Sequence, residues 1–138
     1  MSWLVDTNIL SDLRKGERAD PGIRAWFSET VESDLFTSVL VIGELRRGVE
    51  SIRRRDVPSA LALEQWLARL AGEFRDRILP VDAAIAERWG RLNVPDPVPT
   101  VDGLLAATAL EHQLILVTRN VRDIQRTGVK FLDPTAPG

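Results

Sequence analysis

Residues 3–10 read WLVDTNIL, and this stretch decides the fold. Its first three residues are apolar and predict a β-strand over 2–5 that stops at Asp6. The apolar residues that follow recur at spacings that share one helix face, which predicts a helix over 8–15. A strand followed by a helix opens an α/β unit, and ligands of open α/β sheets bind outside the carboxyl ends of the strands. Asp6 is therefore the first candidate site residue.

The rest of the chain alternates between the same two patterns. Apolar runs predict further strands over 35–38, 78–81, 114–117 and 129–132. Periodic apolar residues predict further helices over 21–31, 39–54, 58–75, 83–92 and 101–112. This alternation predicts the α/β class, with a central parallel β-sheet flanked by α-helices. We expect a single domain over 1–138, with a Pro-rich C-terminal tail at about 133–138.

Some individual residues refine this prediction. Pro80 places the strand that contains it at a sheet edge, because proline cannot donate a ladder hydrogen bond. The run at 114–117 is uniformly apolar, which is typical of a central parallel strand covered on both faces. Aromatic residues on helix faces are expected in the core, and they are Trp26, Phe27, Trp66 and Trp89. The apolar stripe of the third helix is expected to comprise Val39, Ile42, Leu45 and Val49.

Composition excludes several classes of site. The 138 residues are 44% hydrophobic and 28% charged, which is ordinary for a globular domain. The chain has no cysteine, so thiolate metal sites are excluded, and its one histidine, His112, excludes a multi-histidine zinc site. His112 is expected in solvent. A formal charge of −2 is not that of a strongly basic nucleic-acid binder. Without a signal peptide or a spanning apolar run, we expect a cytoplasmic protein.

Three further acidic residues occupy settings comparable to that of Asp6. Glu44 lies beside the apolar stripe of a helix, and Asp102 lies in the first turn of another. Asp123 follows the most apolar strand of the chain, shortly after Asn120. If both strands belong to one parallel sheet, Asp6 and Asn120 lie at the same edge, and Glu44 and Asp102 approach on helices.

Each acid also has an ordinary structural explanation. A helix cap would explain Asp6, and a surface pair with Arg47 would explain Glu44. The helix dipole would explain Asp102. A turn motif at the exit of the most apolar strand would explain Asn120 and Asp123.

Gathered at one place, the four acids would need a cation, because carboxylates repel one another and lose solvation. Mg²⁺ or Mn²⁺ suits such a set of oxygen donors. The chemistry that this arrangement favours is metal-assisted phosphodiester hydrolysis, in which one metal activates a water and another stabilises the leaving oxygen.

Four segments resemble, in order, the motifs of PIN-domain proteins. They are residues 5–11 (VDTNILS), 38–48 (SVLVIGELRRG), 102–112 (DGLLAATALEH) and 116–123 (LVTRNVRD). The similarity extends from near the N-terminus to about residue 132. Its nearest branch is the VapC-type toxins of bacterial type II toxin–antitoxin systems, in particular the FitB-like group. The resemblance implies a PIN fold and an Mg²⁺- or Mn²⁺-dependent endoribonuclease.

The resemblance also implies roles for particular residues. Asp6, Glu44 and Asp102 correspond to the three core catalytic acids of such proteins, and Asp123 is the candidate for a fourth. The same four acids, with Asn120, are the candidate metal ligands. Asn120 stands where the family has an acidic residue, so it adds no negative charge, and Asp123 is expected to supply that charge directly or through water.

Other positions are expected to support this site. Asn8 and Thr118 are candidate hydrogen-bond partners of the ligands. Arg46 and Arg47 lie in the densest basic stretch and are candidate RNA contacts. Gln113 stands where relatives often have glycine, and we expect this departure to matter little.

The resemblance finally implies partners: a cognate VapB-type antitoxin, an RNA substrate, a second copy in a homodimer or a larger toxin–antitoxin assembly, and operator DNA only through the antitoxin. No membrane partner is expected. Two alternatives remain open at this point. One is a non-catalytic PIN scaffold in an antitoxin/DNA repressor complex, which Asn120 favours. The other is another α/β phosphotransfer protein, such as a response-regulator receiver or a haloacid-dehalogenase-like phosphatase.

Overall fold

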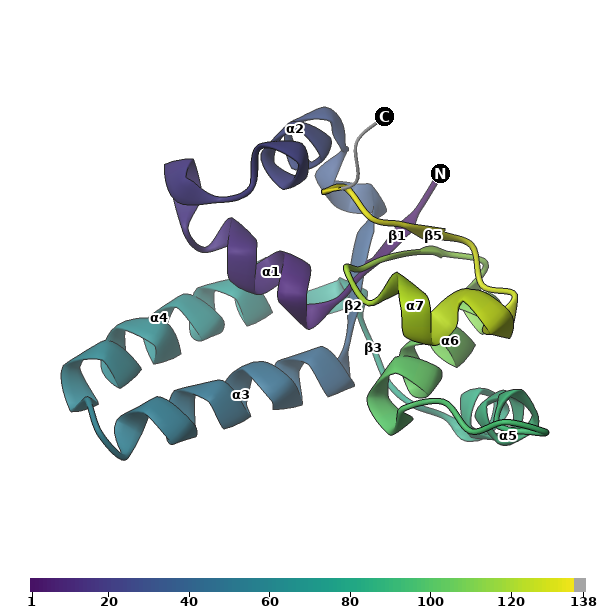
Figure 1. Ribbon diagram of the computed structural model, residues 1–138. Coiled ribbons are helices and arrows are strands. Elements are labelled where there is room, and N and C mark those ends of the chain that lie inside the picture. Colours follow the sequence, from purple (N-terminus) through teal and green to yellow (C-terminus); the bar gives the residue numbers. More distant parts are fainter. Residues whose placement is uncertain (136–138) are drawn as a thin grey trace.

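The computed structural model describes residues 1–135, which form a five-stranded parallel sheet flanked by helices (Figure 1). The strands are β1 (Trp3–Val5), β2 (Leu35–Ser38), β3 (Ile78–Leu79), β4 (Ile115–Val117) and β5 (Phe131–Leu132). Their order across the sheet is β3-β2-β1-β4-β5, and every neighbouring pair is parallel. The α/β class and the central parallel sheet are therefore as predicted.

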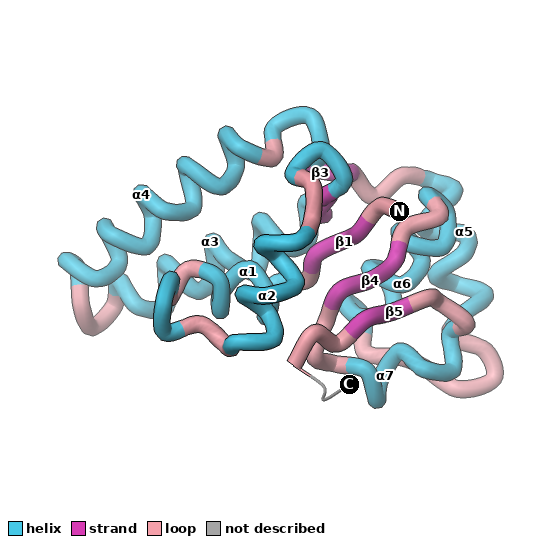
Figure 2. Tube along the Cα trace, turned by 90° about the horizontal axis from the view of Figure 1, so that it is seen from above, coloured by secondary structure: helices cyan, strands magenta, loops and turns pink. Residues whose placement is uncertain are grey.

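Seven α-helices surround this sheet in the described residues. They are α1 (Thr7–Leu13), α2 (Pro21–Glu29), α3 (Val39–Arg53), α4 (Val57–Glu73), α5 (Ala83–Leu92), α6 (Thr100–His112) and α7 (Val121–Ile124). Figure 2 shows α1 to α4 on one side of the strands and α5 to α7 on the other. Six of the seven lie where the periodicity predicts them. The seventh, α7, corrects the prediction of a polar turn around Asp123.

Side-chain caps explain where several helices begin. The carboxylates of Asp20, Asp56 and Asp82 each accept a hydrogen bond from a backbone N–H in the first turn of α2, α4 and α5. The Ser38 hydroxyl caps α3 in the same way. Four short 3₁₀ turns that the sequence pattern did not predict join other elements, at Gly16–Arg18, Glu32–Asp34, Arg75–Arg77 and Gln125–Thr127.

Strand positions match the predictions from proline and apolar content. β3 is an edge strand and ends at Leu79, directly before Pro80. β4 lies between β1 and β5, and Leu116 and Val117 are buried. The carboxyl ends of β1 and β4 are in register, because Val5 pairs with Val117. Residues that follow these two strands therefore meet at one edge of the sheet.

The core differs from the predicted one at two aromatic or apolar positions. Phe27 is 44% exposed, since α2 buries only Ile23 and turns Phe27 outward. Val39 is 43% exposed, because the buried stripe of α3 follows Val41, Leu45 and Val49 at intervals of four.

The tryptophans are partly buried. Trp26 and Trp66 pack against the main core, and Trp26 meets Trp3 edge to face. Trp89 of α5 lies against Gly103 in the first turn of α6, where an added Cβ would crowd the indole ring.

The α6 helix ends in a residue with a left-handed backbone. Gln113 adopts a left-handed conformation with φ 58° and closes the helix with its backbone N–H. Glycine adopts this conformation without steric cost, whereas a side chain at Cβ is strained there. Gln113 thus occupies a position that favours glycine, while His112 beside it is exposed, as expected.

Two further features complete the description. Pro134 passes so close to α2 that only glycine fits at Gly22. The end of the predicted Pro-rich tail, 136–138, lies outside the described residues. Across residues 1–135, none of the helices has both the length and the apolar character needed to cross a membrane.

Candidate active site at the carboxyl edge of the sheet

Asp6 is held at the carboxyl end of β1 by three neighbouring groups. Its backbone N–H donates to Val117 O of β4 at 3.0 Å, which continues the strand pairing. One carboxylate oxygen, Oδ1, accepts from the backbone N–H of Thr7 at 2.6 Å. The other, Oδ2, accepts from the Thr118 hydroxyl at 2.7 Å. The helix-cap explanation for Asp6 is thus met, yet its side chain is only 3% exposed and its second oxygen faces the end of β4.

The segment after β4 is tied to α1 by a small polar network. The Thr118 hydroxyl that donates to Asp6 accepts in turn from the Asn120 backbone N–H at 3.0 Å. The Asn8 side chain accepts from the Arg119 backbone N–H at 3.3 Å, and its amide nitrogen lies 3.5 Å from both Asp6 Oδ2 and Thr118 Oγ1. These contacts fix the register of α1 against the loop that carries Asn120.

Glu44 reaches the same edge from α3. Its Oε1 accepts from the Thr7 hydroxyl at 2.5 Å. It forms no ion pair with Arg47 in the part of the chain that the structure describes, so the surface-pair explanation is not met. Thr7 is a contact that sequence reasoning missed. The available signal was its place between Asp6 and Asn8, at the first helical position.

Asp102 approaches from the first turn of α6. The α6 helix has no side-chain cap, and Asp102 is partly buried. The Asn120 amide nitrogen donates to Asp102 Oδ1 at 3.4 Å, a long hydrogen bond. Asp123 is exposed on α7, and its charge acts on Asp102. The structure therefore brings Asp6, Glu44 and Asp102 to one edge, with Asp123 at its rim.

Electrostatics show that these acids disfavour one another's charge. Burial raises the pKa of the Asp6 carboxyl above its ordinary value, and the charges of Asp102 and Glu44 raise it further. Burial likewise raises the pKa of Asp102, with contributions from Asp123 and Glu44. Hydrogen bonds from Thr118 to Asp6 and from Asn120 to Asp102 oppose these rises without cancelling them.

The donor set fits a hard divalent cation. All available ligand atoms are oxygens, and no Lys or Arg of residues 1–135 forms an ion pair with any of the four acids. In the same range, no three Asp, Glu or His side chains converge tightly enough to hold an ion by themselves. Waters would therefore have to complete the coordination of an ion at this edge, as they usually do for Mg²⁺, which takes one or two carboxylates.

The two arginines expected to contact RNA differ in their surroundings. Arg46 forms ion pairs with Glu50 of α3 and Glu64 of α4, so its guanidinium serves the packing of these two helices. Arg47 is exposed and forms no ion pair within residues 1–135.

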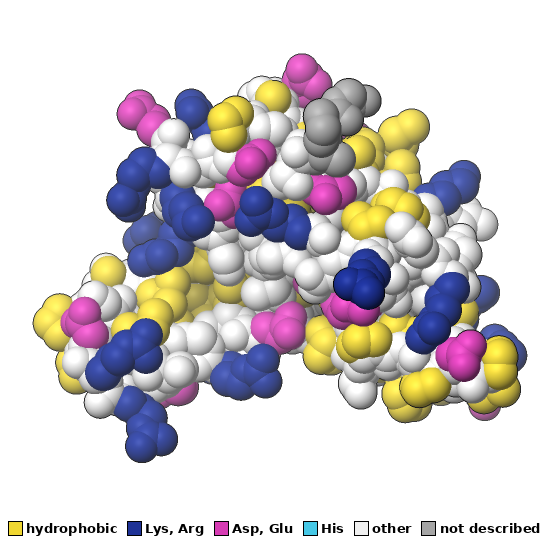
Figure 3. All heavy atoms as spheres, viewed as in Figure 1, with side chains coloured by type: hydrophobic (Ala, Val, Ile, Leu, Met, Phe, Trp, Pro, Cys, Tyr) yellow, Lys and Arg dark blue, Asp and Glu magenta, His cyan; other side chains and the backbone are white. Residues whose placement is uncertain are grey.

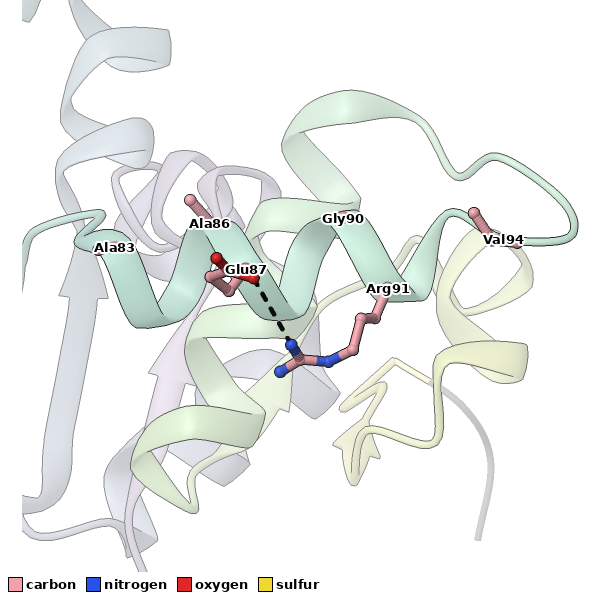
Figure 4. Close-up of a pocket in the computed structure, with 6 residues that line it drawn as sticks. All are labelled: Ala83, Ala86, Glu87, Gly90, Arg91 and Val94. Carbon is pink, nitrogen blue, oxygen red and sulfur yellow. Dashed lines mark ion pairs between the residues drawn. The ribbon is translucent and has the colours of Figure 1, made fainter.

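One hollow on the described surface lies away from these acids. It measures about 760 Å³ and covers the outer face of α5 (Figure 4). Its lining residues are Ala83, Ala86, Glu87, Gly90, Arg91 and Val94. Glu87 and Arg91 form an ion pair at 3.8 Å across it. It gathers one acid and one base on a single helix, so we locate the chemistry at the sheet edge instead.

Comparison with known proteins gives consistent matches over nearly the whole chain. The PIN domain profile matches residues 3–130. The chain is 28% identical to the VapC ribonuclease Y4jK of Sinorhizobium fredii, over 97% of this chain and 98% of that protein. The crystal structure of FitAcB from Neisseria gonorrhoeae superposes with a TM-score of 0.88 at 25% identity, covering 96% and 97% of the two chains. A toxin–antitoxin complex from Klebsiella pneumoniae superposes with a TM-score of 0.74 at 27% identity, covering 96% and 98%.

Proposed function

We propose, from the premise that this chain belongs to the PIN domain family, that it is a toxin-type endoribonuclease dependent on Mg²⁺ or Mn²⁺. One observation carries the proposal. The pKa of Asp6 is raised by burial and by the charges of Asp102 and Glu44, the pKa of Asp102 is raised by burial and by the charges of Asp123 and Glu44, and no protein cation of residues 1–135 pairs with these acids. A divalent cation would relieve this repulsion.

The residues have separate parts in this proposal. Asp6, Glu44 and Asp102 would surround the ion, one or two of them binding it directly and the rest through water, and Asp123 would contribute directly or through water. Bound there, Mg²⁺ or Mn²⁺ would supply an activated water and a positive charge beside the phosphate oxygens. Asn120 already donates to Asp102, so we assign its amide oxygen to waters around the ion.

Hydrogen bonds within the protein fix the orientation of the carboxylates of Asp6 and Glu44. The Thr118 hydroxyl and the Thr7 N–H each hold one oxygen of Asp6. The Thr7 hydroxyl holds Oε1 of Glu44, which leaves Oε2 without a donor among the described residues. Fixed carboxylates lose little freedom when an ion or a phosphate arrives, so such preorganisation favours binding and reaction.

Partners follow from the relatives. One solved neighbour is a toxin–antitoxin complex, and another is FitAB bound to the IR36 DNA fragment. We propose that a cognate VapB-type antitoxin holds this chain inactive, that the chain forms a homodimer, and that operator DNA is reached only through the antitoxin. Its place would be the cytoplasm, where RNA is available.

One alternative, a response-regulator receiver, differs from this chain in its sheet topology. A response-regulator receiver has the strand order 2-1-3-4-5, whereas this sheet has 3-2-1-4-5. A direct test distinguishes a non-catalytic scaffold from a nuclease. Purified chain, free of antitoxin, is incubated with several RNAs in Mg²⁺, in Mn²⁺ and in EDTA, beside Asp6→Asn. Metal-dependent cleavage that Asp6→Asn loses is the expected result. No cleavage of any RNA by the unmodified chain would contradict the nuclease proposal and favour the scaffold.

A further inference from the structure

The acidic edge poses a problem for an RNA substrate, because carboxylates repel the phosphates that flank the cleaved bond. Cations near the acids must compensate for this repulsion. Two exposed arginines near the acidic centre belong to different elements: Arg119 follows β4, and Arg47 lies on α3. Figure 3 shows that basic side chains accompany acidic ones in the middle of this face.

Arg119 is fixed next to the centre by its backbone. It directly follows Thr118, whose hydroxyl donates to Asp6, and its own N–H donates to Asn8 Oδ1 at 3.3 Å. Its side chain is exposed and forms no ion pair or side-chain hydrogen bond within residues 1–135. Its charge contributes to lowering the pKa of the buried Asp12, whose carboxylate already accepts from the Asp20 N–H and pairs with Lys15.

Arg47 occupies the opposite side. It lies three residues after Glu44 on α3, so the two side chains share a helix face. Glu44 itself is directed to Thr7 of α1. Consecutive residues of α1 thus reach in opposite directions: Thr7 toward α3, and Asn8 toward the loop of Arg119. Asp6 precedes both, between the two arginines.

From this arrangement we propose that Arg119 and Arg47 bind RNA phosphates on opposite sides of the acidic centre. The inference rests on the proposed nuclease function and adds how the substrate lies: the RNA backbone crosses the sheet edge from α3 to the end of β4. It replaces Arg46, expected from sequence to contact RNA, by Arg119, because Arg46 is engaged by Glu50 and Glu64.

Binding without metal tests this directly. A fluorescein-labelled, unstructured single-stranded RNA is titrated with the chain in EDTA, at several KCl concentrations. Arg119→Gln and Arg47→Gln are each expected to weaken binding several-fold and to reduce the slope of log K against log salt by about 0.7. Arg119→Lys should keep the slope, since it keeps the charge. Arg55→Gln is the matched control, because Arg55 is also exposed but lies in the turn between α3 and α4, and Figure 1 shows that this turn is far from the sheet.

The outcomes separate the inference from the proposed function. If Arg119→Gln binds RNA with the affinity and slope of Arg55→Gln, the inference is wrong, whatever the unmodified chain cleaves. Failure of the unmodified chain to bind RNA in EDTA would also overturn it. If the unmodified chain cleaves no RNA in metal while the arginine variants still lose binding, the nuclease proposal fails and the phosphate contacts stand. With cleavage present, Arg119→Gln should raise KM and leave kcat nearly unchanged.

Discussion

The hydroxyl of Thr7 donates to Glu44 Oε1 at 2.5 Å, and this contact joins α1 to α3 at the edge where Asp6 ends its strand. A hydrogen bond to a charged group is among the stronger polar contacts in proteins. Here it fixes a carboxylate that would otherwise swing on a flexible side chain beside two other acids. Thr7 therefore acts on the site through Glu44, without being a ligand in our proposal.

Replacing Thr7 by valine tests that role. Valine keeps the shape and loses the hydroxyl, so it should remove about 1.5–3 kcal/mol of interaction with Glu44. We expect RNA cleavage to fall by about tenfold to a hundredfold. Thr7→Ser restores the hydroxyl and should recover most of the activity in the same assay. Equal losses in Thr7→Val and Thr7→Ser would show that the methyl group, and not the contact with Glu44, matters.

The raised pKa values of Asp6 and Asp102 predict how stability depends on pH without metal. Each folded pKa lies above the ordinary value of 3.8, so the unfolded chain releases these protons first. The stability that they contribute is present below pH 3.8 and is lost as pH rises through the folded values. As the pH falls from 7 through the folded pKa values toward 3.8 in EDTA, the contribution of these two groups should therefore raise Tm. Saturating Mg²⁺ should raise Tm at pH 7, by mass action.

Asp6→Asn should weaken that dependence. The amide has nearly the same size, cannot ionise and remains a good helix cap. We expect a higher Tm than the unmodified chain at pH 7 in EDTA, and RNA cleavage reduced at least about a hundredfold. A lower Tm across this pH range would mean that the charged carboxylate is stabilising at this position, contrary to the direction of its pKa.

Much of this arrangement could be predicted from local patterns. The position of Asp6 at a strand end follows from an apolar run that stops at an acid, and the parallel sheet follows from alternating strands and helices. The pairing of β1 with β4 then brings Asp6 and Asn120 to one edge. These features depend on residues that are close in sequence or on a general rule of topology.

Other features depend on how elements pack, which local patterns do not encode. The contact between Thr7 and Glu44 spans 37 residues and two helices. The α7 helix has only four residues and buries only Ile124, so its sequence cannot show a helical period of apolar residues. Phe27 lies on α2 at the edge of a hollow that Trp66 and Phe74 also line, so it stays 44% exposed. The engagement of Arg46 likewise required α4 to lie against α3.

The left-handed residue at the end of α6 gives a prediction on stability alone. Gln113 has φ 58°, which costs a residue with a Cβ about 1 kcal/mol relative to glycine. Gln113→Gly should therefore raise Tm by about 3–5 °C in thermal unfolding. Cleavage should be unchanged, because Gln113 lies at the opposite end of α6 from Asp102. Gln113→Ala serves as the control and should give no such gain, since alanine has the same steric cost.

Asp102 and Asp123 differ in their surroundings. Their amide variants should therefore differ in how RNA cleavage depends on Mg²⁺ concentration. Asp102 is partly buried and accepts from Asn120, whereas Asp123 is exposed and acts on Asp102 through its charge. Asp102→Asn should remove cleavage at any Mg²⁺ concentration, because a ligand at the centre is lost. Asp123→Asn should shift the Mg²⁺ dependence to higher concentration and recover activity at saturation, because an exposed charge chiefly attracts the ion. The measurement is the cleavage rate against Mg²⁺ concentration for both variants. If Asp123→Asn stays inactive at saturating Mg²⁺, Asp123 is a direct ligand, and α7 must then bring its carboxylate closer to Asp102 than the structure places it.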